Sequence, residues 1–94
     1  MTPEIHLLDQ LSTAPAPYLA IEEQVFGKDR DFALGTIVAL MREGKVVMTR
    51  ADEEQPLAKV QAWAGAPWDT ATIAALGSAT VDITEAGLDY FLDQ

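Results

Sequence analysis

Cysteine is absent from this chain of 94 residues, so disulfide bonds and thiolate metal sites are excluded. Histidine occurs once, at His6, and no spacing of carboxylates around it matches a metal site. Basic residues are also scarce: six lysines and arginines stand against 15 aspartates and glutamates, which gives a net charge of −9. Phosphate backbones repel such a charge, so nucleic-acid binding would require the few basic residues to gather on one face. An acidic surface also keeps a small apolar protein soluble without any further role.

Long apolar runs are missing as well. No run approaches the roughly 18 residues that a membrane-spanning helix needs. The N-terminal sequence MTPEIHLLDQL lacks the basic and then apolar pattern of a signal peptide. We therefore expect a cytoplasmic protein with no membrane partner. The hydrophobic fraction of 49% is too high for a disordered chain, and the length suits one domain over residues 1–94.

Catalytic motifs are not found in the sequence. It contains neither a Gly-x-x-x-x-Gly-Lys phosphate loop nor a Gly-x-Ser-x-Gly nucleophile elbow, and Ser12 and Ser78 have no neighbouring base. The consecutive residues Asp52, Glu53 and Glu54 lack the spacing of a calcium loop and are typical of a solvated acidic tip. We expect no enzymatic activity, no cofactor and no bound metal.

Helical spacing of apolar residues predicts two helices in the first third of the chain. The first begins at Pro3 behind a capping Thr2, because proline is tolerated at the first helical position. The proline-containing segment 12–17 ends it. The second helix covers residues 18–26 and stops at Gly27.

A third helix begins at a capping aspartate, either Asp29 or Asp31, and ends at Gly44. The β-branched residues that follow predict a strand over residues 45–50. An acidic loop at 51–55 comes next.

Alternating side chains predict a second short strand over residues 57–63. A short helix over 68–76, capped by Asp69, is expected to follow. Residues 80–84 alternate as a further strand, and Thr84 caps a last helix.

Two segments carry a family resemblance. Residues 31–50, DFALGTIVALMREGKVVMTR, combine a helix, a glycine and a strand, and their spacing is that of a recognition helix at Ala33, Ile37, Leu40 and Gly44. In VDITEAGLDYFL, residues 81–92, the ITEAG sequence is similar to the LTEkG that opens the last helix of several regulator families. Together with the preceding helices, these segments resemble the winged helix-turn-helix family over residues 18–50 and 80–92.

The resemblance implies a small α+β fold. It consists of three N-terminal helices, a short antiparallel β-sheet with an elaborated wing, and a C-terminal helix. The wing would contain residues 51–79, which are far more than a plain wing needs.

The third helix has few side chains able to read DNA. If Ala33, Ile37 and Leu40 face the core, we expect the outward positions to be Arg30, Asp31, Leu34, Gly35, Val38 and Met41. Major-groove readout needs Arg, Asn or Gln at base edges, and this face is mostly apolar. An apolar face is normally covered, here by residues 57–76, by a second copy of the chain or by another protein.

Two tryptophans lie on either side of a proline turn. Tryptophans often anchor protein interfaces, although these two could equally cover the core. The candidate partner-binding residues are Leu34, Val38, Met41, Trp63 and Trp68. By analogy with regulators whose terminal helices form the dimer, the candidate dimer residues are Ile5, Leu8, Tyr90 and Phe91.

These observations favour a small acidic winged-helix-like module that acts by protein–protein interaction, through self-association or a regulatory partner. The alternative is a transcription regulator that binds duplex DNA through the third helix and the wing. Its candidate DNA contacts, which are otherwise ordinary solvated charges, are Lys28, Arg30, Arg42, Lys45 and Arg50.

Overall fold

The computed structural model describes residues 2–94, which form six helices and a four-stranded antiparallel sheet. The helices are α1 (Pro3–Thr13), α2 (Tyr18–Gln24), α3 (Arg30–Arg42), α4 (Leu57–Gly65), α5 (Thr70–Gly77) and α6 (Glu85–Leu92). The strands are β1 (Ala16–Pro17), β2 (Val46–Arg50), β3 (Glu53–Glu54) and β4 (Ala79–Ile83). The expected α+β class is therefore confirmed. Within the described residues, no helix is both long enough and apolar enough to cross a membrane.

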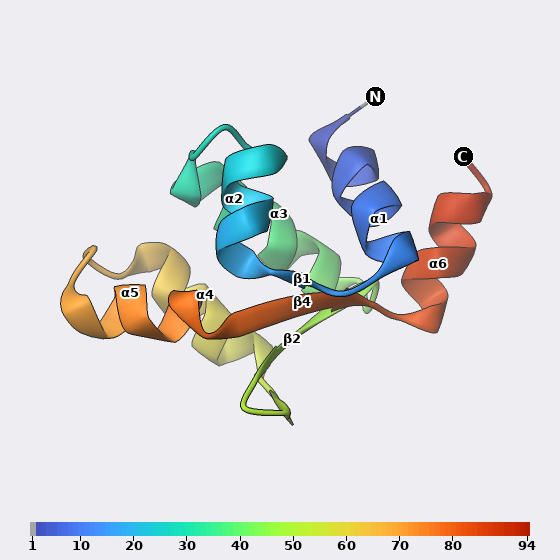
Figure 1. The fold of residues 1–94 in the computed structure, drawn as a ribbon. Coiled ribbons are helices and arrows are strands. Elements are labelled where there is room, and N and C mark those ends of the chain that lie inside the picture. Colours follow the sequence, from blue (N-terminus) through green and yellow to red (C-terminus); the bar gives the residue numbers. More distant parts are fainter. Residues whose placement is uncertain (1) are drawn as a thin grey trace.

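The sheet has the order β1-β4-β2-β3, and β2 pairs with β4 along the whole length of both strands. Figure 1 shows α1, α2 and α3 on one side of these strands, with α4 and α5 at one end of the molecule and α6 beside α1 at the other. Alternate residues of β2 and β4, including Val46, Met48 and Val81, are buried beneath the helices. Three helices precede β2, as expected, although the short strand β1 interrupts them within the segment predicted only to end the first helix.

Side-chain caps fix the helix starts where the sequence predicts them. The side chains of Thr2, Asp29, Asp69 and Thr84 each accept a hydrogen bond from a backbone N–H three residues later. Each cap satisfies one of the N–H groups that a helix start leaves without an intrahelical partner. Gly44, with a φ of 74°, ends α3 in the left-handed conformation that glycine adopts readily.

The predicted strand over residues 57–63 is wrong, because this segment forms the helix α4. Val60 and Trp63 are buried and Leu57 is half-buried, so the apolar residues recur every three positions, as on one face of a helix. The remaining positions carry alanine, lysine and glutamine, which are good helix formers. The helical spacing of the apolar residues was therefore a better predictor of this segment than their alternation.

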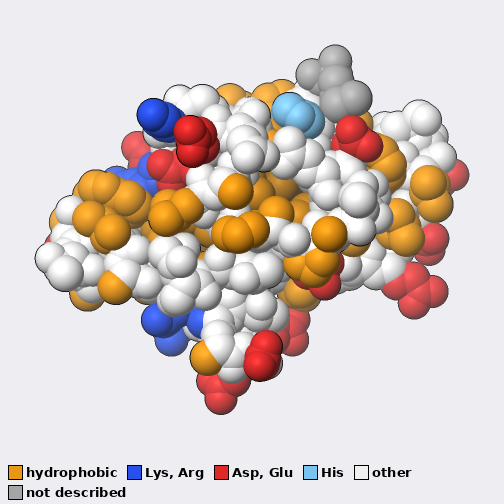
Figure 2. Space-filling view, viewed as in Figure 1, with side chains coloured by type: hydrophobic (Ala, Val, Ile, Leu, Met, Phe, Trp, Pro, Cys, Tyr) orange, Lys and Arg blue, Asp and Glu red, His pale blue; other side chains and the backbone are white. Residues whose placement is uncertain are grey.

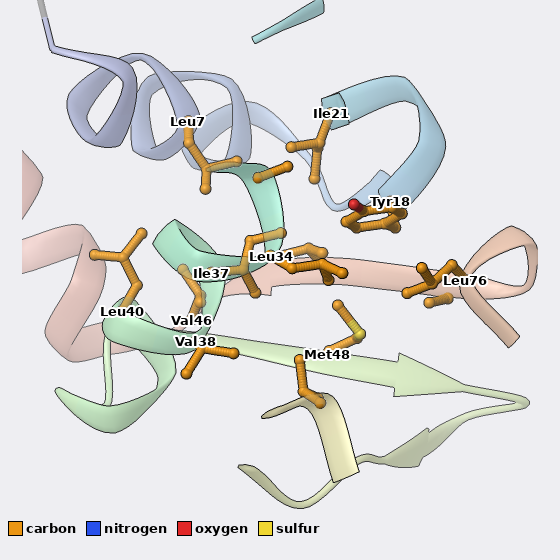
Figure 3. Close-up of a cluster of buried hydrophobic side chains, with 14 of the residues drawn as sticks. Leu7, Tyr18, Ile21, Leu34, Ile37, Val38, Leu40, Val46, Met48 and Leu76 are labelled. Carbon is orange, nitrogen blue, oxygen red and sulfur yellow. The ribbon is translucent and has the colours of Figure 1, made fainter. Parts of the chain in front are cut away.

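The core extends through the helices and the sheet (Figure 3). Leu34 and Ile37 of α3 lie between α2 and the sheet in this view, and Met48 of β2 points toward them. Ile37 and Leu40 are buried, as the sequence predicts. The expectation that Leu34 and Val38 point outward is wrong, since both are buried and α4 packs against α3. The face is thus covered from within the chain, by part of the segment inserted between the two main strands.

The terminal helices pack on each other. α1 contacts α6, and Figure 1 shows both near the two chain ends. Leu8 is fully buried, which contradicts its prediction as a dimer contact. Ile5, Tyr90 and Phe91 are partly buried against the same core. These apolar residues therefore help to pack the two terminal helices within one chain.

Candidate functional site

The candidate DNA contacts at α3 lie far apart. Arg30 is the first residue of the helix and Arg42 the last, so its 13 residues place them about 18 Å apart along the axis. Lys28 is exposed in the turn before α3. In the view of Figure 2, basic side chains form separate groups with acidic side chains beside them.

The two candidates beyond α3 contact other parts of the chain. Lys45 Nζ lies 3.4 Å from Glu43 Oε2 and 3.5 Å from the centroid of the Tyr90 ring. Arg50 Nε donates a hydrogen bond of 2.9 Å to Ser78 Oγ. Both cations already contact neighbouring side chains, so they are less available to bind a phosphate group.

Among the candidate partner residues, Trp68 alone is strongly exposed. Leu34, Val38 and Trp63 are buried, and Met41 is partly buried against the core. The centre of the predicted partner surface is therefore buried, and Trp63 belongs to the core from its place on α4 of the inserted segment. Trp68 remains at the surface just before α5.

Three large apolar side chains are exposed on α2, α5 and the segment before α5. The exposed fractions of Leu19, Trp68 and Ile73 are 44%, 44% and 42%. The helices α2 and α5 pack together, and Leu19 Cδ1 lies 3.9 Å from the position that a Cβ on Gly77 would take. Ile73 is one helical turn before Gly77, on the same side of α5. Figure 2 shows hydrophobic side chains gathered over the α5 end of the molecule.

A charged cleft adjoins Trp68. It has a volume of about 340 Å³ and is lined by Glu22, Lys28, Asp29, Arg30, Asp31 and Trp68. We call it the Arg30 cleft, and together with Leu19 and Ile73 it forms the α2–α5 surface. The guanidinium carbon of Arg30 lies 4.3 Å from the centroid of the Trp68 ring, and Nη2 lies 3.7 Å from Asp31 Oδ1. Arg30 is thus held by a cation–π contact and a long ion pair.

Polar groups beneath the cleft have unused hydrogen-bonding capacity. Tyr18 Oη, Glu22 Oε2 and Arg30 Nη1 are buried and have no hydrogen-bond partner within residues 2–94. Burial raises the pKa of the Tyr18 hydroxyl well above its ordinary value, and the nearby Glu22 carboxylate raises it further. Buried polar atoms are normally paired. The Tyr18 hydroxyl can donate to the neighbouring Glu22 carboxylate, so Arg30 Nη1 is the buried atom at this place that most clearly lacks a partner.

A second groove of about 540 Å³ lies between the end of α3, β2 and the start of α4. Apolar residues, including Met41, Val47 and Leu57, make up much of its lining, and Glu54 is the one ionisable residue in it. The buried Gln55 presents an Oε1 atom without a partner. With one ionisable residue, this groove offers no acid–base pair.

No group of histidine and carboxylate side chains within residues 2–94 has the arrangement of a metal site. Neither a family model, a curated protein nor a solved structure matches the chain. The role of the α2–α5 surface can therefore be inferred only from its own residues.

Sequence reasoning identified part of this surface. Arg30 and Trp68 were candidates, but for different roles, and their direct contact was not expected. Leu19 and Ile73 carried no signal, because single apolar residues on short helices do not reveal which side faces water. Glu22 carried no signal either, because its buried oxygen depends on how α2 meets the start of α3.

Proposed function

We propose that the protein is a small acidic, non-enzymatic module that binds another protein through the α2–α5 surface. The single observation that carries this proposal is the exposed Trp68 ring, which stacks on Arg30 and borders a cleft with unpaired buried polar atoms. Tryptophan and arginine are enriched among the residues that dominate binding energy at interfaces. The neighbouring Leu19 and Ile73 extend the apolar area that a partner would bury.

We also propose that the module has a winged-helix arrangement. The order of elements supports it: three helices, the strand β2 and a returning strand β4 that pairs antiparallel with β2. The helices α4 and α5 would then be an insertion in the wing. In this arrangement α4 covers the side of α3 that carries Leu34 and Val38.

The interaction role is tested by photo-crosslinking in cells of the source organism. A benzoylphenylalanine at position 73 is expected to form an adduct of one discrete mass, because this side chain lies within the proposed interface. The same group at Gln61, which is exposed on α4, is the matched control and is expected to give none. Equal labelling from both positions, or none from position 73, would contradict the interaction role.

The alternative, DNA binding, is expected to fail a direct test. At a low salt concentration of about 50 mM, fluorescence anisotropy with labelled random duplex DNA should show no binding below about 100 μM protein, weaker than ordinary non-specific binding. The reasons are the net charge of −9 and the separation of Arg30 from Arg42 on α3. Binding that weakens steeply with added salt, and that is lost in a Lys28→Ala and Arg42→Ala double variant, would establish the regulator role instead.

A further inference from the structure

We infer that the α2–α5 surface takes a basic amphipathic peptide segment of another protein, with a lysine or arginine side chain entering the Arg30 cleft. The assignment depends on the interaction role proposed above, because it specifies the chemistry of the partner at that same surface.

The charge around the apolar residues favours a basic partner. Three carboxylates line the Arg30 cleft, those of Glu22, Asp29 and Asp31. Two further acids are close in sequence: Glu23, one helical turn after Leu19, and Asp69, directly after Trp68. Hydrogen bonds from Thr72 hold the pKa of Asp69 below its ordinary value, so this acid keeps its charge in mildly acidic solution.

The two basic residues of the cleft do not cancel this charge. Arg30 is turned against Trp68 and Asp31, and Lys28 is exposed at the rim. Three carboxylates against two cations leave the lining of the cleft negative, and complementary potentials guide association between proteins. A second copy of the chain is the less favourable occupant, since it would bring another nine net negative charges to the same place.

The unpaired buried atoms define what the partner must supply. Glu22 Oε2 is a buried acceptor whose neighbouring donor is the Tyr18 hydroxyl, and a carboxylate has further lone pairs that can accept from a cation or N–H group. Arg30 Nη1 is a buried donor without an acceptor. A peptide provides both, because a lysine ammonium or arginine guanidinium can donate to Glu22 while a backbone carbonyl accepts from Arg30. The Tyr18 hydroxyl is fully buried beside Glu22 and can donate to its carboxylate.

The apolar part of the partner would pack on Trp68, Ile73 and Leu19. These side chains lie on two helices in contact with each other, so a helix or short strand with apolar residues on one side covers them together. The pattern of the ligand is therefore apolar on one side and cationic on the other.

The test is a titration of the ¹⁵N-labelled full chain with a short synthetic peptide that carries leucines on one helix face and lysines on the other. We expect amide shifts confined to α2, α5 and the start of α3. A peptide with glutamates in place of the lysines is expected not to bind. In the Glu22→Gln variant the dissociation constant should rise about tenfold, because a buried charge partner is removed.

The matched control is Glu54→Gln, which removes the same charge from the exposed β3 tip and should leave the affinity within about twofold. The same spectra report whether each variant remains folded. Equal weakening by both variants, shifts at the β3 tip, or no binding at about 1 mM peptide would overturn the assignment. So would dimers of the free chain, seen by sedimentation, that Ile73→Ser disrupts, since a second copy would then be the occupant.

Failure of the peptide assignment can be distinguished from failure of the interaction role. If the peptide does not bind but position 73 still crosslinks a discrete partner, the interaction role stands and the partner chemistry is wrong. If position 73 crosslinks nothing, the interaction role itself fails.

Discussion

Replacing Gly87 with alanine is expected to lower the free energy of unfolding by about 3 kcal/mol, as overpacking of a rigid contact does. Gly87 lies in the first turn of α6, where its N–H donates to Thr84 Oγ1. A Cβ at this position would overlap the carbonyl oxygen of Lys45 and lie 2.9 Å from Ile83 Cγ1. The obstacle is backbone rather than a flexible side chain, so α6 must move away from the start of β2.

This loss is large relative to the total stability of so short a chain. A domain of 94 residues has a total stability of roughly 5 to 14 kcal/mol, so a loss of about 3 kcal/mol is a large share. Thermal denaturation followed by circular dichroism should show the midpoint falling by about 12 °C or more. Amide exchange should be faster in α6 than in the other helices.

Gly35→Ala is the matched control for this substitution. Gly35 is exposed in the middle of α3, and a Cβ there would meet nothing within 4 Å. Because alanine is the better helix former, we expect this variant to gain roughly 0.5–1 kcal/mol. A Gly87→Ala variant as stable as Gly35→Ala would mean that α6 does not rest against Lys45.

Leu34→Ala is expected to destabilise the protein by about 2–5 kcal/mol, the range for truncating a buried leucine. Leu34 has an exposed fraction of 0%, and α4 packs against the helix that carries it. Alanine also has the higher helix propensity, so the loss is one of packing alone. Urea denaturation of wild type and variant measures the difference.

Leu92→Ala provides the comparison, because Leu92 is 69% exposed at the end of α6. It should change the stability by no more than about 0.5 kcal/mol. If Leu34→Ala were equally mild, Leu34 would not be packed within the chain, and the side of α3 that carries it would be open.

The ends of most elements could be predicted from the sequence. Thr2, Asp29 and Thr84 cap their helices with bonds to a backbone N–H three residues later, so the signal and its partner lie in the same short segment. Gly44 ends α3 for a similarly local reason, since its left-handed φ requires no distant contact. Local chemistry therefore determined where helices begin and end, and the α+β class followed from their order.

The segment over residues 57–65 shows where local chemistry was insufficient. Its side chains fit an alternating pattern and a helical one, and helix propensity favours the second without showing which side is buried. Burial of Val60 and Trp63 against the core selects the helix, because only the helical spacing places both on the side that meets α3.

The candidate site depended on tertiary structure even more strongly. By itself, the sequence determined the acidic charge, the absence of cysteine and the capped helices. The tertiary structure decided which apolar residues remained exposed, because α3 is packed so that Leu34 and Val38 are buried while Trp68 stays 44% exposed. It also brought Arg30 against Trp68 across a long stretch of sequence. Burial is a property of contacts between distant segments, and no pattern within one helix specifies what will pack against its second face.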